Sequence, residues 1–238
     1  MALEIHPLRL AEVGLDASFR VWQMTPGTPV TAPCTGYLVL GGETPVMVDT
    51  GIANIVGPFT QTPEQTLQAN LARHGLEAGD IGLVVHTHIH VDHVGYDDQL
   101  PNARIVIQRG ELEYAANPLF PPFLFDPADH AKLTGPLRDR VEIVDGDAEI
   151  APGIRTIRTG GHTPNHQMVY VDVPSGQAVI TGDNVYLADP GVTQQVPPGY
   201  FVNLFEVTAA LERIKADADH VLPMHDGSVY ETYPDGVR

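Results

Sequence analysis

Cysteine is nearly absent from this 238-residue sequence, which contains only Cys34. A single cysteine cannot form a disulfide within the chain, and it also excludes a thiolate metal site. Cys34 follows Pro33, just before an apolar stretch that we interpret as a strand. We therefore expect a buried and chemically inert thiol.

Positive charge is scarce as well. Lysine and arginine number 13 against 30 aspartates and glutamates, which gives a formal net charge of −17 at pH 7. A field of this sign repels phosphate groups, so we expect neither nucleic acid nor an anionic membrane as a partner. A small-molecule substrate is the expected partner. The sequence leaves open whether the protein forms a homodimer.

Long apolar runs are missing too. No run of about 20 apolar residues could span a bilayer, and residues 1–7 lack the basic and apolar regions of a signal peptide. We therefore expect a cytoplasmic protein. The apolar content of 43% and the charged content of 18% are ordinary for a globular chain. The length suits one domain over residues 1–238.

Short apolar segments separated by turns predict an α+β fold of packed sheets with helices outside. Thr62, Pro63 and Gln65 form the pattern of a helix start, and Gly75 is typical of a helix end. A second helix is expected over Phe205–Ala216. Strands are expected at Leu3–Val13, Phe19–Met24, Tyr37–Leu40, Val46–Val48, Ile81–Val85, Ile105–Ile107, Val141–Val144, Ile154–Ile157, Met168–Val173, Ala178–Thr181 and Val221–Leu222.

Residues 117–130 follow a short helix expected over Gly110–Ala116 and differ from the rest in composition. Four prolines interleave there with Phe120, Phe123 and Phe125. The prolines forbid a regular element, while the aromatic side chains need a surface to bury against. We interpret this segment as a candidate lid loop. Packing of the loop against the domain is the alternative.

A dense cluster of histidines directly follows the strand expected at Ile81–Val85. Residues 86–93 read His-Thr-His-Ile-His-Val-Asp-His. In an extended chain, side chains two residues apart point the same way, so His88 and His90 can converge on one ion at about 2.0–2.1 Å. Asp92 and His93 are adjacent and can face a second point once the chain turns. The segment therefore predicts ligands for two metal sites.

Three further candidate ligands each follow an apolar strand elsewhere in the chain. His162 stands in the sequence Gly-Gly-His-Thr-Pro, Asp183 follows the apolar residues 178–180, and His225 follows Val221–Leu222. Strand ends are where sheets commonly present functional groups. The shared context favours one centre that joins these residues to the histidine cluster.

The order His-x-His-x-Asp-His, followed by a distant His, Asp and His, resembles the metallo-β-lactamase superfamily. The resemblance implies a four-layer αββα sandwich with two zinc ions at one edge; iron or manganese are alternatives. It also implies that Asp49, in Val-Met-Val-Asp-Thr-Gly, braces the ligand loops. The implied ligands are His88, His90 and His162 for one metal, Asp92, His93 and His225 for the other, and Asp183 as the bridge between them.

Tyr186, three residues after Asp183, is similar to a tyrosine of the N-acyl-homoserine lactonase branch; a buried core tyrosine is the alternative. Residues 94–96, Val-Gly-Tyr, depart from the two glycines of glyoxalase II. The resemblance thus implies a quorum-quenching lactonase in which a metal-bridging hydroxide opens the ring. Tyr186 would then stabilise the oxyanion, and Asp92 would carry a proton to the leaving alkoxide.

Two other functions stay open. The same centre could hydrolyse another bond, in a β-lactam, a cyclic imide, a thioester or a phosphodiester. Alternatively, an iron-dependent oxidoreductase could use the same ligands, because imidazole and carboxylate suit both zinc and iron. A purely structural metal module is disfavoured, since four ligands typically close such a site. His86 is expected to pack structurally, and His166 and His220 to act as hydrogen-bonded supports.

Overall fold

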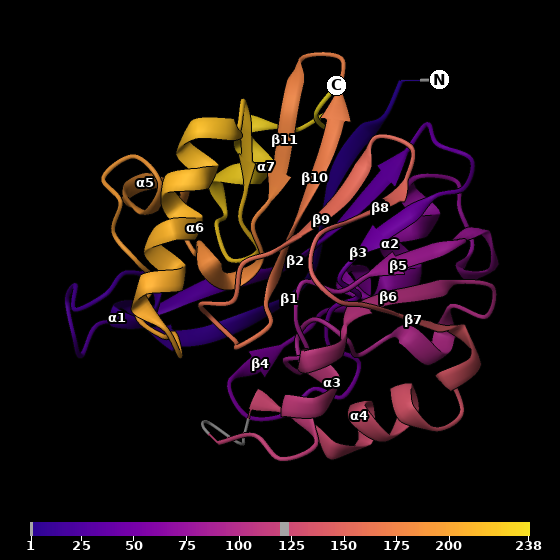
Figure 1. Cartoon of the computed structure of the whole chain (residues 1–238), viewed down its shortest axis with the longest axis horizontal. Helices are drawn as coiled ribbons and strands as arrows, with labels where there is room; N and C mark the ends of the chain where they lie inside the picture. The colour runs from indigo at the N-terminus through magenta and orange to yellow at the C-terminus, as the bar shows by residue number, and fades with distance from the viewer. Residues whose placement is uncertain (1, 120–123) are drawn as a thin grey trace.

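The computed structural model describes residues 2–119 and 124–238, and Figure 1 shows two β-sheets with helices outside them. The strands are β1 (Glu4–Asp16), β2 (Pro29–Leu40), β3 (Val46–Val48), β4 (Phe59–Thr60), β5 (Leu83–Val85), β6 (Arg104–Gln108), β7 (Val141–Val144), β8 (Ala148–Ala151), β9 (Ile154–Arg158), β10 (Gln167–Val173), β11 (Gly176–Ile180) and β12 (His220–Leu222). The α-helices are α1 (Ala17–Arg20), α2 (Leu67–Arg73), α3 (Arg109–Ala115), α4 (Pro127–Thr134), α5 (Ala188–Gly191), α6 (Leu204–Asp217) and α7 (Ser228–Thr232).

The first sheet has seven strands in the order β4-β1-β2-β3-β5-β6-β7, and the second has five in the order β12-β11-β10-β9-β8. From β3 to β7 the neighbouring strands of the first sheet are parallel, and β11 pairs in parallel with β12. The chain ends lie close together, since Ile5 bridges to Val237.

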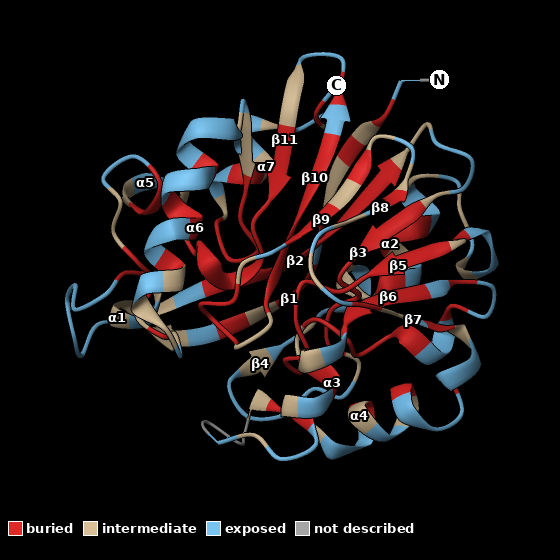
Figure 2. Cartoon of the chain, viewed as in Figure 1, coloured by how far each residue is buried: buried red, intermediate tan, exposed pale blue. Residues whose placement is uncertain are grey.

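The apolar core is divided by the two sheets. One cluster, which includes Tyr37 and Val169, fills the space between them. Leu71 of α2 belongs to a second cluster on the outer face of the first sheet, and Leu211 of α6 to a third on the outer face of the second sheet. Figure 2 accordingly shows buried strands inside and exposed helix surfaces outside. These layers confirm the predicted α+β fold, the αββα sandwich.

Strands that are buried on both faces explain the continuous apolar runs in the sequence. In β5, Leu83 and Val85 pack between the sheets, whereas Val84 packs under the helices of the first sheet. Successive side chains of a strand point to opposite faces of the sheet. Here helices cover one face and the second sheet covers the other, so both faces need apolar residues. The strand predicted at Ile81–Val85 is confirmed.

The strand predicted at Phe19–Met24 is wrong. Asp16 caps the short helix α1 there by accepting a hydrogen bond from the Ser18 N–H at 3.0 Å. Its second oxygen accepts from the Gly27 N–H at 2.6 Å and closes the following loop. A local cap thus outweighs the weak apolar alternation. By contrast, the helix start predicted near Thr62 is present as a 3₁₀ turn that leads into α2.

The prolines suggested that segment 117–130 contains no regular element. This prediction is wrong at the end of the segment, where a helix begins. Helix α4 begins at Pro127, because the first helical position needs no N–H donor. Phe125 is buried, with its ring centroid 4.7 Å from that of His90. Phe120 and Phe123 lie outside the described residues, and the lid stays a prediction.

Loops at one edge of the sandwich bring the candidate ligands together. Segments that directly follow β5, β11 and β12 meet there with the turn between β9 and β10. Among the residues that the structure describes, no helix combines the length and the apolarity that crossing a membrane requires.

Candidate metal centre

Asp49, directly after β3, is hydrogen-bonded to the histidine segment 86–93. Its buried carboxylate accepts hydrogen bonds from the Thr87 N–H at 2.8 Å, the Thr87 hydroxyl at 2.7 Å and His93 Nδ1 at 2.8 Å. Burial alone would raise the pKa of Asp49, but His93 and His86 lower it to about 2. The ionised carboxylate therefore fixes both the backbone at Thr87 and the ring of His93.

Three imidazoles and one carboxylate meet in one half of the centre. His90 Nδ1 lies 2.9 Å from His88 Nε2 and 3.1 Å from His162 Nε2. Asp183 Oδ2 lies 3.4 Å from His162 Nε2 and 4.0 Å from His88 Nε2. All four residues are buried, and one ligand atom from each lies within 4.8 Å of the others. Loops far apart in the chain thus supply one compact group of donors.

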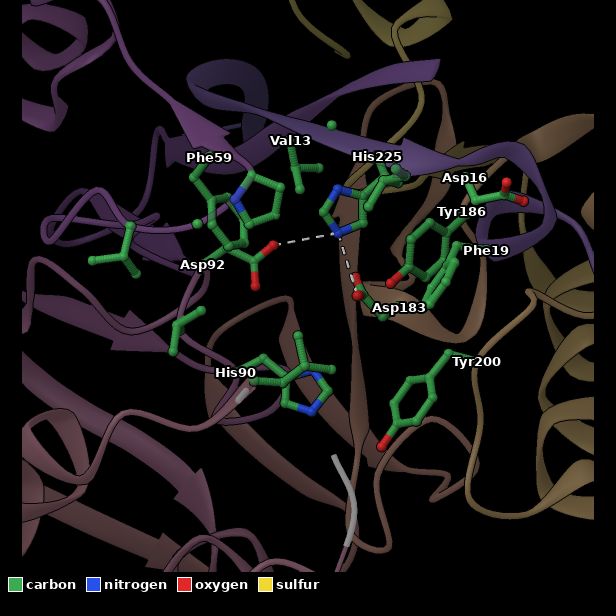
Figure 3. Close-up of a pocket in the computed structure, with 17 residues that line it drawn as sticks. Val13, Asp16, Phe19, Phe59, His90, Asp92, Asp183, Tyr186, Tyr200 and His225 are labelled. Atoms are coloured by element: carbon green, nitrogen blue, oxygen red, sulfur yellow. Dashed lines mark ion pairs between the residues drawn. The ribbon is translucent and has the colours of Figure 1, made fainter. Parts of the chain in front are cut away.

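The other half of the centre, called the acidic half below, contains two carboxylates, those of Asp92 and Asp183. His93 Nε2 lies 3.7 Å from Asp92 Oδ1 and 3.6 Å from Asp183 Oδ1. His225 Nε2 lies 3.6 Å from Asp92 Oδ2 and 3.3 Å from Asp183 Oδ2, as the dashed lines in Figure 3 show. Asp183 therefore faces both halves, which is the position that a bridging ligand requires.

Hydrogen bonds on the outer side of the rings direct lone pairs inward. Thr87 gives its only hydroxyl hydrogen to Asp49, so His88 Nδ1, 3.0 Å from the Thr87 oxygen, must be the donor of that pair. His162 Nδ1 donates to the Tyr200 carbonyl at 3.2 Å, and His225 Nδ1 to the Pro33 carbonyl at 2.8 Å. Each Nε2 is then free to bind a cation, because partners on the far nitrogen fix the tautomer of a metal-binding histidine.

The pKa values of the histidines are shifted in opposite directions in the two halves. Burial lowers the pKa of His162 to about 4, and burial with neighbouring histidines lowers the pKa of His88 and His90 well below the usual value. For His93 burial acts the same way, but Asp92, Asp49 and Asp183 outweigh it and raise the pKa to about 10. The acidic half thus attracts positive charge, while the other half offers neutral imidazoles.

The residues present fit a pair of transition-metal ions. Among the described residues, two atoms that face the candidate ligands, His93 Nε2 and Asp183 Oδ1, are buried without a hydrogen-bond partner. Such groups are costly to bury unless something else satisfies them. A set of imidazole and carboxylate donors suits zinc, iron or manganese. That these residues bind metal remains a prediction, which the geometry supports.

Two further histidines, His86 and His166, support the centre from outside. His86 is buried 2.9 Å from Asp97 and 3.4 Å from Asp49; burial opposes a charge on its ring, but Asp97 and Asp49 raise its pKa to about 9. His166 Nε2 accepts from the Asp183 N–H at 3.1 Å. Gly182 has φ 52°, and a Cβ there would lie 2.3 Å from His166 Nε2, so this close approach requires glycine. His220, the first residue of β12, pairs instead with Ser175 Oγ at 2.8 Å, so its expected role as a support of the centre is not confirmed.

Sequence reasoning missed Glu111, a fully buried residue of α3. One oxygen accepts from the Thr163 hydroxyl at 2.6 Å and the Asn165 N–H at 3.1 Å, and the other accepts from the Ile89 N–H at 3.2 Å. Glu111 thereby links the loops of the candidate ligands on both sheets. No local pattern marks this residue, since a glutamate in the first turn of a helix is ordinary.

A mostly apolar cavity of about 360 Å³ opens onto the acidic half of the centre. Its walls include Phe19, Phe59 and Leu124, with Asp92, Asp183, Tyr186 and His225 at one end. Figure 3 shows the Tyr186 hydroxyl directed toward Asp183, and its ring stacks on His225 with centroids 4.6 Å apart. Burial, Asp183 and Asp92 raise the pKa of Tyr186 well above its usual value. The phenol therefore keeps its proton and can donate it in a hydrogen bond.

Several known proteins with similar sequences are named N-acyl homoserine lactonases. One from Bacillus thuringiensis is 29% identical over 188 residues, which cover 72% of each chain. Another, from Azorhizobium caulinodans, is 25% identical and covers 97% of this chain and 91% of its own.

Solved structures share the fold. An N-acyl homoserine lactone hydrolase, with the product N-hexanoyl-L-homoserine bound at its catalytic metal centre, has a TM-score of 0.82 at 24% identity and covers both chains fully. A dizinc quorum-quenching lactonase in complex with a product has a TM-score of 0.75 at 17% identity, covering 94% of this chain and 88% of its own. The family model described as Metallo-beta-lactamase superfamily matches residues 30–225, so the chain belongs to this superfamily, as its histidine motif implied.

Proposed function

We propose that this protein hydrolyses a lactone ring at a dinuclear metal centre, with an N-acyl-homoserine-lactone-like molecule as the substrate. The observation that carries the proposal is the apolar cavity that ends at Asp92, Asp183, Tyr186 and His225. A polar reacting group can sit against these residues while an acyl chain lies along the apolar walls. The names of the curated relatives support the same substrate class.

The roles of the protein groups follow from their positions. When bound, two metal ions supply Lewis acidity and a water acidic enough to react near neutral pH. The Tyr186 hydroxyl donates a hydrogen bond to the carbonyl oxygen, where negative charge develops. Asp92 lines the same end of the cavity and can take the proton that the attacking water loses and pass it to the leaving alkoxide. The apolar walls exclude water from the acyl chain.

A substrate panel tests the proposal. The zinc-loaded protein is expected to hydrolyse N-acyl homoserine lactones faster than a β-lactam, a cyclic imide, a thioester or bis-p-nitrophenyl phosphate. Faster hydrolysis of any of these competitors would contradict the lactonase assignment. Elemental analysis of protein purified without added metal separates zinc from iron, and bound iron together with redox activity would favour the oxidoreductase alternative.

Tyr186→Phe removes the hydroxyl and keeps the ring that stacks on His225. We expect kcat for lactone hydrolysis to fall about 100-fold, the scale of losing one donor to a developing oxyanion. Metal content should stay at the wild-type level, because the phenol is not a predicted ligand. Steady-state kinetics and elemental analysis measure the two quantities, and a parallel loss of both would contradict the assigned role.

A further inference from the structure

Two apolar residues of the cavity wall are also exposed at the surface. Phe19 of α1 is 42% exposed and Val56, in the loop before β4, is 53% exposed, and both line the cavity that opens onto the acidic half. Exposed apolar side chains that gather at a cavity are typical of ligand-binding grooves, because a ligand can cover them. A bound apolar chain would therefore remove both side chains from water.

Phe19 and Phe59 lie on different sides of the cavity. Figure 3 shows Phe59 on the side of Asp92 and Phe19 on the side of Tyr186, with Val13 of β1 between the two aromatic rings in this view. All of these residues line the cavity. A chain that begins at a group bound against Asp92 and Tyr186 would thus have an aromatic wall on either side.

Pairing with the first sheet fixes the wall that contains Phe59. Phe59 of β4 pairs with Val13 of β1, and the Gly14 N–H donates to the Pro58 carbonyl at 2.9 Å. This wall therefore belongs to the edge of the sheet.

Hydrogen bonds to the segment 197–201 fix the other wall. The Phe19 carbonyl accepts from the Gly199 N–H at 2.9 Å, and the Trp22 N–H donates to the Pro197 carbonyl at 3.0 Å. A Cβ at Gly199 would lie 1.7 Å from the Ser18 carbonyl oxygen, so this close approach requires glycine. Walls that are already held in place need little ordering when a ligand binds, which favours selective binding.

We propose that Phe19 is a specificity-determining residue, which together with Phe59 and Val56 gives the protein a preference for lactones that carry a long acyl chain. The inference rests on the proposed function, because a lactone ring at the metal centre places the chain between these walls. A short chain covers little of them, whereas a longer chain covers more. Each methylene that the walls remove from water should raise kcat/KM about 4-fold.

A series of N-acyl homoserine lactones with butanoyl, octanoyl and decanoyl chains tests the proposal. In the wild type, kcat/KM should rise along the series. Phe19→Ala should lower the ratio of the decanoyl value to the butanoyl value about 10-fold, because much of one apolar wall is lost. The butanoyl value itself should stay near that of the wild type. A wild-type ratio in Phe19→Ala would overturn the proposal, as would a wild type that is fastest with the butanoyl chain.

Phe205→Ala is the matched control. Phe205 of α6 is 86% exposed and is not one of the described residues that line the cavity, so this variant should keep the wild-type ratio. An equal loss in Phe205→Ala and Phe19→Ala would contradict the assigned role.

Trp22 shows whether α1 stays in place when Phe19 is changed. It is the only tryptophan in the chain, and its ring packs edge-on against Phe201 with centroids 5.7 Å apart. Its fluorescence maximum should be the same in Phe19→Ala and the wild type. Val56→Ala alters the cavity without touching α1 and should lower the same ratio by a smaller factor. If Phe19→Ala shifted the Trp22 emission and Val56→Ala kept the wild-type ratio, the proposal would fail.

Binding of a chain without a lactone ring separates this inference from the proposed function. Octanamide and butanamide contain no ester, and calorimetric titration of the zinc-loaded protein measures their affinities. Octanamide should bind the wild type more tightly than butanamide and lose this advantage in Phe19→Ala. That result in a protein that hydrolyses no lactone would support the chain-binding walls while the lactonase assignment fails. Equal affinities for the two amides would overturn the inference even in an active lactonase.

Discussion

Asp49 organises the centre although it is not one of the predicted ligands. Three donors converge on its buried carboxylate, two from Thr87 and one from His93. The bond to His93 Nδ1 fixes the direction in which His93 Nε2 points. Because the Thr87 hydroxyl donates to Asp49, His88 Nδ1 must donate to the Thr87 oxygen. One charge thus determines the orientation of candidate ligands in both halves.

Asp49→Asn tests this orientation. Asparagine also tolerates the backbone φ of 57° at this position, so the change mainly removes charge and one acceptor oxygen. We expect the affinity for metal to fall roughly 10- to 100-fold, because outer partners of metal-binding histidines have effects of this size. Competition with a coloured chelator measures the affinity. Unaltered binding in a folded Asp49→Asn protein would refute the role.

At the scale of elements, α3 joins the two halves of the sandwich through Glu111. This carboxyl group bonds to the loop after β5 and to the loop between β9 and β10. Burial raises the pKa of Glu111 to about 7, although the three donors oppose that rise. The raised pKa makes the stability of this junction depend on pH.

Glu111→Gln is expected to remove this pH dependence. The folded pKa is above the unfolded value of 4.5, so the stabilisation is complete below that value and is lost as the pH rises through 7. Relative to Glu111→Gln, the wild-type free energy of unfolding should fall by about 2 kcal/mol between about pH 5.5 and about pH 8.

Denaturant titrations with saturating metal measure this difference. Glu142→Gln, which alters a half-exposed glutamate of β7, is the control and should follow the wild type. If Glu111→Gln showed the same pH profile as the wild type, Glu111 would not titrate in this range and the assigned environment would be wrong.

At the scale of the whole molecule, the candidate ligands link the two sheets. The segment 86–93 extends from the first sheet, whereas His162, Asp183 and His225 follow strands of the second. Ions held between them would bind the folded chain and not the unfolded one, since the unfolded chain does not bring these residues together. Metal should therefore contribute directly to global stability.

Removal of metal is expected to lower the Tm. At a free metal concentration about 100 times Kd, binding adds about 3 kcal/mol, which corresponds to roughly 5–10 °C for a chain of this size. Calorimetry with and without a chelator measures the shift. His88→Ala, which lacks a predicted ligand of one half, is the control, because chelation should lower its Tm by less than that of the wild type. An identical Tm for chelated and loaded wild-type protein would contradict the predicted centre.

Much of the architecture could be predicted from local patterns. The apolar run at Ile81–Val85 indicated a strand buried on both faces, and Leu83, Val84 and Val85 do face opposite layers. The prediction failed at Phe19–Met24, because the cap from Asp16 and its bond to Gly27 depend on the shape of the loop and not on apolar alternation.

The sequence alone determined the donor chemistry, because the spacing in His-x-His-x-Asp-His is local and sets which side chains point the same way. Only the tertiary structure decided which distant groups join them. Cys34 and Asp92 are 58 residues apart, and Glu111 and Thr163 are 52 apart. Contacts over such separations depend on how strands pair and how sheets pack, and no short stretch of sequence contains that information.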